Sequence, residues 1–208
     1  MVDLKGQYDK IKSEIDAGIK DVIDSTAFIN GGKVKDFTAD LEKYLGVKHV
    51  IPCGNGTDAL QIALMALDLP KGSKVICPAF NYVATSETVA LLGLIPVYVD
   101  VIESTFEIDI EKTKEVIDAD TKVIMPVHLF GQSVNMDAVM ALAKEFDLYV
   151  VEDTAQAIGA DYKGVNYSGK AGTIGNVGIT SFFPSKNSLT IASCKSLCIE
   201  YPSSETLI

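Results

Sequence analysis

The stretch that decides the fold is residues 149–156, YVVEDTAQ, in which an apolar run ends abruptly in two carboxylates. A strand buried on both faces of a sheet is a continuous apolar run, whereas a half-buried strand alternates apolar and polar residues. This run is therefore typical of an inner strand in a parallel sheet covered by helices. Its carboxylates stand at the carboxyl end of the strand, where open parallel sheets bind their ligands.

Similar apolar runs lie on both sides of this stretch, and helical patterns separate most of them. The predicted strands are residues 49–53, 74–78, 96–101, 122–127, 149–152 and 177–183. The predicted helices are residues 7–24, 35–45, 57–68, 84–93, 111–118 and 135–146. The Gly- and Lys-rich segment 160–175 is expected to form a polar hairpin or loop. This alternation predicts an α/β fold with a mainly parallel sheet and helices on its faces.

Composition limits the class of protein. The 208 residues suffice for one full α/β domain, alone or with a fragment of a second, and 48% are hydrophobic. No apolar run reaches the length of a membrane span, and the N-terminus lacks the apolar core of a signal peptide. The net charge of −10 argues against nucleic acid and anionic membranes as partners. We therefore expect a cytoplasmic protein.

The basic residues and the cysteines restrict which ligands can be bound. All 18 residues counted as lysine or arginine are lysines, so a guanidinium cannot grip a carboxylate or phosphate. Bound anions must instead meet backbone N–H groups, hydroxyls or lysines. Cys194 and Cys198 are the closest cysteines, but without neighbouring ligands they are a weak metal signal, and no metal site is predicted.

Residues 54–60, GNGTDAL, follow the first predicted strand. The glycines allow a tight turn, and Thr57 opens a helix whose first N–H groups can bind a phosphate. An ordinary helix cap formed by Thr57 or Asp58 explains the same pattern equally well. The segment is not a Walker loop, because no Gly-Lys-Ser/Thr follows it.

Two further candidates stand at carboxyl ends of strands. Tyr82, within residues 79–85, AFNYVAT, could stack on a flat ring, although most aromatics in such places only cap the core. Asp153 ends the run YVVED, where a buried carboxylate is costly unless a cation meets it. A protonated pyridine nitrogen would be such a cation, but a simple cap on the following helix explains Asp153 as well.

Residues 180–187, TSFFPSKN, place Lys186 just beyond the last predicted strand. Lysines are usually solvated, so this one alone would be assigned to the surface. In a desolvated pocket, however, a lysine has a lowered pKa and attacks carbonyl groups.

The order of these four motifs is more specific than any one of them. GTDAL, YVAT, EDTAQ and SFFPSK together resemble the nucleotide-sugar aminotransferases of the DegT/DnrJ/EryC1/StrS family, which have the aspartate-aminotransferase fold, or fold type I. The resemblance runs to about Asn187 and includes residues 87–93, ETVALLG, and 126–132, PVHLFGQ. It implies that residues 1–187 form a three-layer large domain that binds pyridoxal 5'-phosphate (PLP).

The resemblance also implies a role for each candidate residue. Lys186 would form the Schiff base with PLP and carry protons during the reaction. Asp153 would pair with the pyridinium nitrogen, Gln156 would contact the ring hydroxyl, and Tyr82 would stack on the ring. The residues implied for the phosphate are Gly56, Thr57, Asp58 and Ser181.

The implied activity is transfer of an amino group, typically from glutamate, to a keto nucleotide sugar for polysaccharide or cell-envelope synthesis, in a homodimer. The motif contexts are most similar to members acting on UDP-linked 3-keto-2-acetamido sugars. The family's PLP-dependent sugar dehydratases carry histidine at the position of Lys186, so lysine favours amino transfer over dehydration. The absence of arginine is compatible with a phosphate site made of backbone N–H groups and hydroxyls. It is less compatible with a complete transaminase, because the carboxylates of the amino-acid donor are normally bound by a guanidinium.

The similarity stops inside a motif. After Asn187 the family continues with a glycine-rich turn, a strand and a small C-terminal domain, whereas residues 188–208 are Ser/Thr-rich and without clear period. We therefore expect a divergent tail over 188–208, produced by a frameshift or premature stop, and no small domain. This leaves a truncated remnant that does not catalyse the reaction as the alternative to an active aminotransferase.

Overall fold

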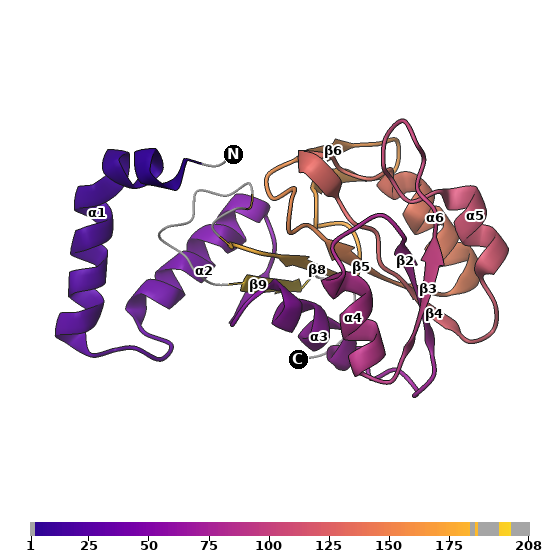
Figure 1. Cartoon of the computed structure of the whole chain (residues 1–208), viewed down its shortest axis with the longest axis horizontal. Helices are drawn as coiled ribbons and strands as arrows, with labels where there is room; N and C mark the ends of the chain where they lie inside the picture. Colours follow the sequence, from indigo (N-terminus) through magenta and orange to yellow (C-terminus); the bar gives the residue numbers. More distant parts are fainter. Residues whose placement is uncertain (1–2, 184–185, 187–195, 201–208) are drawn as a thin grey trace.

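The computed structural model describes residues 3–183 and 186, and the backbone of residues 196–200. Within these ranges a central sheet is covered by helices, with a small hairpin beside it (Figure 1). The helices are α1 (Leu4–Ser25), α2 (Gly32–Leu45), α3 (Gly56–Ala66), α4 (Ala84–Leu91), α5 (Ile110–Val116), the short 3₁₀ helix η1 (Leu129–Gly131) and α6 (Met136–Phe146). The strands are β1 (His49–Cys53), β2 (Lys74–Pro78), β3 (Ile95–Val99), β4 (Thr121–Ile124), β5 (Tyr149–Asp153), β6 (Asp161–Lys163), β7 (Ser168–Lys170), β8 (Val177–Thr180) and β9 (Ser196–Glu200).

The sheet has seven strands in the order β1-β9-β8-β5-β4-β2-β3. From β8 to β3 every neighbouring pair is parallel, which confirms the predicted α/β fold with a mainly parallel sheet. β9 pairs antiparallel with both β1 and β8. Asp153 at the end of β5 is in register with Ile179 of β8, so the chain leaves both strands at the same edge of the sheet.

Successive side chains of the inner strands enter opposite layers, as the pleat of a strand requires. Val75 and Val151 pack under α3 and α4, whereas Ile76 and Val150 pack under α6 on the other face. All four are fully buried, which is why these strands are continuous apolar runs in the sequence. By the same alternation, the side chain of Asp153 belongs to the layer of α3 and α4.

The predicted elements are present with small shifts at their ends. The predicted polar hairpin over 160–175 is the pair β6–β7. The prediction of a last strand over 177–183 was wrong in its length and in its being the last strand. β8 ends at Thr180, and β9 follows it. β9 falls within the expected divergent tail 188–208, yet its backbone fills the gap between β1 and β8. The other residues of this tail lie outside the described ranges.

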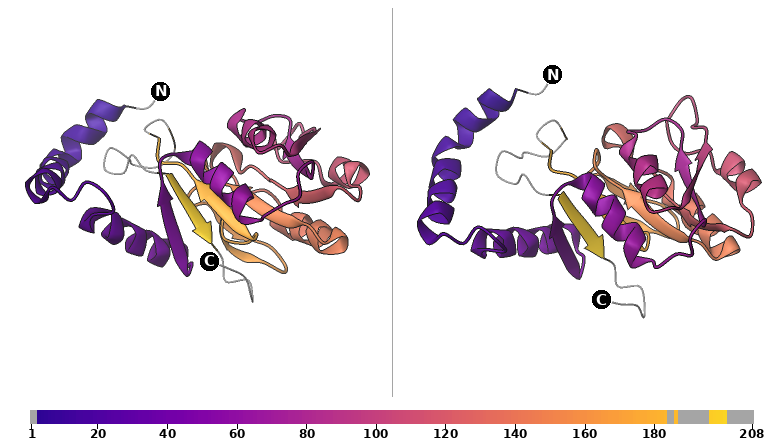
Figure 2. Two further views of the ribbon diagram at one scale, coloured as in Figure 1. Left: turned by 90° about the horizontal axis from the view of Figure 1, so that it is seen from below. Right: turned by 60° about the horizontal axis from the view of Figure 1, so that its bottom comes forward.

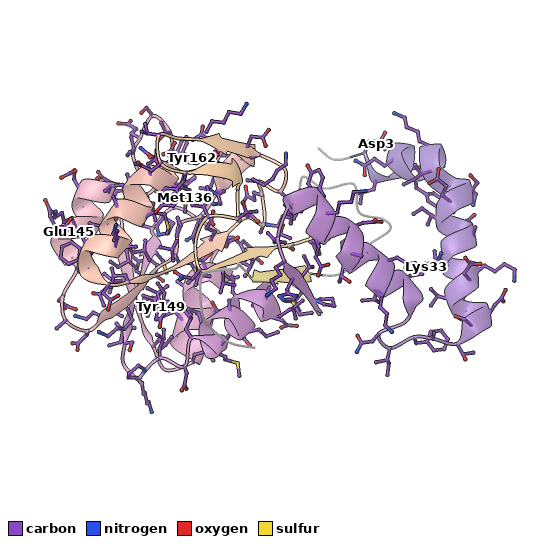
Figure 3. The ribbon with its side chains drawn as sticks, turned by 180° about the vertical axis from the view of Figure 1, so that it is seen from behind. Asp3, Lys33, Met136, Glu145, Tyr149 and Tyr162 are labelled. Atoms are coloured by element: carbon purple, nitrogen blue, oxygen red, sulfur yellow. The ribbon has the colours of Figure 1, made fainter. Side chains whose placement is uncertain are left out.

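α1 stands away from the sheet in Figure 1 and in both turned views of Figure 2, and α2 lies between α1 and the sheet. α2 packs against β1 through a small apolar cluster. α1 is linked to α2 by the ion pair of Asp21 with Lys33, 3.3 Å apart; Lys33 is labelled in Figure 3. Ile15 of α1 is buried, but Ile19 and Ile23 are 55% and 57% exposed. The described residues therefore leave part of the predicted amphipathic face uncovered.

Glu152 is fully buried and holds the turn that leads into β8. Its Oε1 accepts hydrogen bonds from the N–H groups of Ile174, at 2.7 Å, and Gly175, at 2.6 Å. Its Oε2 accepts the N–H of Gly172 at 2.9 Å. Gly172 has φ +84°, and a Cβ there would lie 2.5 Å from Thr154 Cγ2, so this turn requires glycine.

The fourth hydrogen bond to Glu152 comes from His128, whose Nε2 lies 2.9 Å from Oε2. The Nδ1 atom of His128 accepts the N–H of Val134 at 3.0 Å. This contact assigns the ring proton to Nε2, which therefore donates to the carboxylate. Four donors satisfy both oxygens of Glu152 without any exposed group.

Among the described residues, none of the helices combines the length and the apolar character that crossing a membrane demands.

We expect Glu152→Gln to lower the free energy of unfolding by about 3 to 5 kcal/mol. An amide can accept the pair of hydrogen bonds on one side, but its NH₂ group then faces the donors of His128 and Gly172. Chemical denaturation followed by circular dichroism measures the change. Glu145→Gln is the matched control on α6, because Glu145 pairs with Lys114 in solvent (Figure 3) and its loss costs under about 1 kcal/mol. Equal losses in the two variants would contradict the role of Glu152.

Candidate functional site

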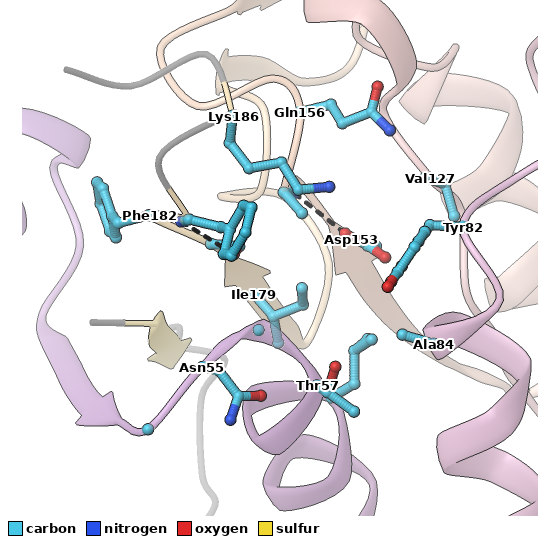
Figure 4. A pocket seen from close by; sticks show the side chains of 16 residues that line it. Asn55, Thr57, Tyr82, Ala84, Val127, Asp153, Gln156, Ile179, Phe182 and Lys186 are labelled. Atoms are coloured by element: carbon cyan, nitrogen blue, oxygen red, sulfur yellow. Dashed lines mark hydrogen bonds between the residues drawn. The ribbon is translucent and has the colours of Figure 1, made fainter. Parts of the chain in front are cut away.

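A cavity of about 510 Å³ opens at the carboxyl edge of the sheet (Figure 4). Its walls come from five separate segments: the β1–α3 connection with the start of α3, the β2–α4 connection, the chain after β4, the end of β5 with the residues after it, and the end of β8 with the chain that follows. Seven of the eight residues predicted from the sequence line it, namely Gly56, Thr57, Tyr82, Asp153, Gln156, Ser181 and Lys186. The topology thus brings together residues that are up to 130 positions apart, counting from Gly56 to Lys186.

One wall of the cavity is the N-terminus of α3. Asn55 is the N-cap, because its Oδ1 accepts the N–H of Asp58 at 2.9 Å, and its carbonyl accepts the N–H of Ala59 at 3.0 Å. The N–H groups of Gly56 and Thr57 precede the first intrahelical bonds and lie on the cavity wall. Such N–H groups, together with the helix dipole, attract an anion.

The cap is therefore Asn55, and the expectation that Thr57 or Asp58 caps this helix was wrong. Asp58 does not line the cavity among the described residues: its carboxylate accepts a hydrogen bond from Asn55 Nδ2 at 2.9 Å. Asn55 itself lines the cavity, and sequence analysis assigned it no role. Its signal was present, because Asn followed three residues later by Asp, ahead of an apolar run, is typical of a helix start.

Ser181, which is 7% exposed, lies next to Gly56 at the N-terminus of α3. A Cβ on Gly56 would lie 2.9 Å from Ser181 Cβ, closer than side-chain carbons approach each other. The absence of a side chain at Gly56 thus lets the helix end and the Ser181 hydroxyl approach one small space. A group held there would meet backbone N–H donors and hydroxyls but no guanidinium, as the composition requires.

Asp153 lies at the floor of the cavity and is 6% exposed. Its Oδ1 accepts the N–H of Ala155 at 3.0 Å, and its Oδ2 accepts the hydroxyl of Thr85 at 3.0 Å. Both donors are uncharged. Burial raises the pKa of Asp153 above its ordinary value, although these hydrogen bonds and the charge of Lys186 oppose the shift. A cation placed in the cavity would be attracted to this carboxylate.

Lys186 and Tyr82 face each other across the cavity and both point toward Asp153 (Figure 4). Lys186 Nζ lies 5.3 Å from the centroid of the Tyr82 ring, within the range of a cation–π contact. Tyr82 is 64% exposed, so its ring does not cap the core, the alternative that the sequence left open. Gln156 completes this side, with its Oε1 accepting the N–H of Phe130 at 3.3 Å.

Metal ligands do not gather in the described residues, where no group of three or more His, Cys, Asp or Glu could hold an ion. The pair Cys194 and Cys198 lies outside the side chains that the structure describes.

The α/β fold, with its mainly parallel sheet, is that of aminotransferase structures. The chain belongs to the DegT/DnrJ/EryC1/StrS aminotransferase family, whose profile matches residues 9–193.

Two relatives show the similarity in sequence. Over 185 residues the chain is 46% identical to UDP-2-acetamido-2-deoxy-3-oxo-D-glucuronate aminotransferase of Pseudomonas aeruginosa, covering 89% of this chain and 50% of the relative. Over 187 residues it is 41% identical to UDP-N-acetyl-3-dehydro-alpha-D-glucosamine 3-aminotransferase of Acidithiobacillus ferrooxidans, covering 90% and 50%. The chain thus spans about half the length of these relatives.

Solved structures agree with this membership. A DegT/DnrJ/EryC1/StrS aminotransferase from Brucella abortus superposes with a TM-score of 0.89 at 35% identity, over 98% of this chain and 55% of that one. GDP-4-keto-6-deoxy-D-mannose-3-dehydratase of E. coli, solved with bound hydrated PLP, superposes with a TM-score of 0.79 at 30% identity, over 98% and 49%. The first of these similarities confirms the predicted α/β fold as one found in aminotransferases, of which this chain spans about half.

We expect Asp153→Asn to stabilise the chain without cofactor, and to do so more at pH 8 than near pH 4. Because the folded state raises the pKa of Asp153 above its ordinary value of 3.8, folding loses stability as the pH rises through that interval. The amide removes the buried charge and keeps partners for Ala155 and Thr85. Denaturant unfolding at the two pH values measures the effect.

Asp161→Asn is the control of opposite sign, because the ion pair with Lys170 lowers the pKa of Asp161. That substitution should leave the stability unchanged or slightly lower at pH 8. If Asp153→Asn were no more stable than the parent at pH 8, burial of the Asp153 carboxylate would not lower the free energy of unfolding, and the prediction would be wrong.

Proposed function

We propose that this chain is the PLP-binding part of an aminotransferase that places an amino group on a keto nucleotide sugar. The observation that carries the proposal is the convergence of Lys186, Asp153 and the N-terminus of α3 on one cavity. Each group alone has an ordinary structural explanation. Together they offer an amine, an anion and an anion-binding helix end, the complements of an aldehyde, a protonated ring nitrogen and a phosphate.

The residues of the cavity fit PLP in charge and shape. The buried carboxylate of Asp153, with uncharged donors on both oxygens, complements a protonated pyridine nitrogen. Gly56, Thr57 and Ser181 offer N–H and hydroxyl donors for the phosphate. Tyr82 offers an exposed ring face for stacking, and Gln156 an amide for the ring hydroxyl.

When bound, PLP supplies an aldehyde carbon that condenses with amines and a protonated ring that accepts electrons from the substrate carbon. The protein's part is to bind, orient and move protons. Lys186 would hold the cofactor through Nζ and would be placed to take and return a proton in the cavity. Asp153 would hold the protonated ring nitrogen, because the hydrogen-bond donors on its buried carboxylate are uncharged.

The substrate we propose is a UDP-linked 2-acetamido sugar with a ketone at the third carbon, and the donor is glutamate. The two relatives named above act on sugars of this kind by their names. Dehydration is disfavoured, because the family's dehydratases carry histidine at the position of Lys186. Catalytic activity of a chain that spans half of its relatives is part of the proposal and is tested separately from cofactor binding.

Reduction with borohydride after incubation with PLP should fix the cofactor on Lys186, detected as a single modified peptide by mass spectrometry. Lys186→Ala should abolish this product, because the only amine lining the described cavity is removed. Lys144→Ala, at an exposed position of α6, controls for surface labelling. Labelling that is spread over surface lysines and unaffected by Lys186→Ala would overturn the cofactor assignment.

Amino transfer is measured as the 2-oxoglutarate that the PLP-loaded chain forms from glutamate. Release that needs Lys186 supports an active half-reaction. Trapping at Lys186 without release, even with a UDP-linked 3-keto-2-acetamido sugar added, supports the alternative of a cofactor-binding remnant.

We also propose that a second copy of the chain covers the exposed apolar face of α1. Ile19 and Ile23 lie on one side of this helix, and Phe28 and Ile29 follow it with exposures of 64% and 87%. Because α1 stands away from the sheet (Figure 2), the sheet does not cover these four exposed apolar side chains. A homodimer is also the assembly that the family resemblance implies.

Light scattering after gel filtration should give twice the monomer mass for the parent and the monomer mass for Ile19→Glu combined with Ile23→Glu. Charges on this face cannot be buried against a partner. Lys10→Glu, at an exposed position of the same helix, should remain dimeric. A parent chain that is monomeric at micromolar concentration would refute the dimer without affecting the cofactor assignment.

A further inference from the structure

Thr85 lies in the first turn of α4 and is 1% exposed. Its Oγ1 donates to Asp153 Oδ2 at 3.0 Å, across 68 residues of sequence. A threonine inside a helix usually gives its hydroxyl proton to a carbonyl of the preceding turn. Thr85 instead links its helix to the carboxylate at the floor of the cavity.

The other buried threonines inside the described helices follow the usual pattern. Thr88, one turn further along α4 and fully buried, donates to the carbonyl of Thr85 at 3.2 Å. Thr113 of α5, also fully buried, donates to the carbonyl of Asp109 at 2.7 Å. These hydroxyls serve their own helices, and the contrast shows that burial alone does not direct the hydroxyl of Thr85 to another element.

The backbone of Thr85 contacts a second part of the cavity. Its N–H donates to the carbonyl of Tyr82 at 3.2 Å, which closes the turn that carries the exposed Tyr82 ring. A single residue therefore holds Tyr82 through its backbone and Asp153 through its side chain. These are the two groups that would contact a flat ring from its face and from its edge.

The hydroxyl also supplies half of the hydrogen bonds on Asp153, since Ala155 N–H occupies the other oxygen. The other titratable groups acting on this carboxylate are Lys186, His128 and the buried thiol of Cys77. Removal of the Thr85 hydroxyl would leave Oδ2 without its described donor in a desolvated place.

We propose that Thr85 is a positioning residue, which fixes the Asp153 carboxylate relative to Tyr82 and thereby shapes the cavity for a flat, cationic heteroaromatic ring. The inference rests on the proposed function, because it takes the ring nitrogen of PLP as the partner of Asp153. Thr85 itself is not among the described residues that line the cavity.

The test compares the PLP dissociation constants of Thr85→Val, Thr85→Ser and Thr88→Val, followed by fluorescence quenching of the folded chain. Valine keeps the shape of threonine without its hydroxyl, so Thr85→Val should bind PLP about tenfold more weakly. Thr85→Ser keeps the hydroxyl and should stay within about twofold of the parent. Thr88→Val, which loses an equally buried hydroxyl, should do the same. Equal weakening in the two valine variants would assign Thr85 a merely structural role and overturn the proposal.

A second measurement needs no cofactor, so that failure of the proposed function is distinguished from failure of this inference. The carbon-13 signal of the Asp153 carboxyl, assigned with Asp153→Asn, is titrated in the chain without PLP. The Thr85 hydroxyl bond favours the ionised form, so the pKa of Asp153 should rise in Thr85→Val and return in Thr85→Ser. An unchanged titration in Thr85→Val would overturn the positioning role even if PLP binds, and a shift would uphold it even if PLP does not.

Discussion

The structure depends on two consecutive carboxylates at the end of one buried strand. Because side chains alternate along β5, Glu152 and Asp153 enter opposite layers of the sheet. Glu152 receives four hydrogen bonds from the turn before β8 and from His128, and so its charge is satisfied within the protein. Asp153 receives two, both from uncharged groups. The first carboxylate thus builds the scaffold, and the second, with only uncharged hydrogen-bond donors, attracts a cation in the cavity.

These two roles are physically linked. The turn that Glu152 holds leads directly into β8, whose end delivers Ser181 and Lys186 to the cavity. Parallel register then sets the ends of β5 and β8 side by side, so Asp153 and the chain bearing Lys186 meet at one edge. A substitution that releases the turn held by Glu152 would therefore displace Lys186. This holds although the residues of that turn are not among the described lining of the cavity. Site geometry here is a consequence of strand register and of one fully satisfied buried anion.

Most of the fold was readable from the sequence, because inner parallel strands such as YVVED and amphipathic helices have distinct local patterns. Seven of eight predicted site residues line one cavity, since the carboxyl ends of parallel strands must share an edge. The features that the sequence did not predict depend on contacts between segments that are far apart in the chain. β9 is stabilised by pairing with β1 and β8, partners that its own Ser/Thr-rich surroundings do not indicate. The contact of Thr85 with Asp153 likewise joins two elements whose relative placement no single-sequence pattern contains.

The lack of arginine is best understood from the anion-binding wall. A phosphate at the N-terminus of α3 would be held by neutral N–H and hydroxyl donors and by the helix dipole. In the proposed function, Lys186 is then the only basic residue among the described lining of the cavity, and it is not tied to the phosphate by an ion pair. An amine held that way would be less nucleophilic, because it stays protonated next to a dianion. Neutral recognition of a phosphate would thus leave Lys186 available for covalent chemistry, while Asp153 would meet the charge of a protonated ring nitrogen.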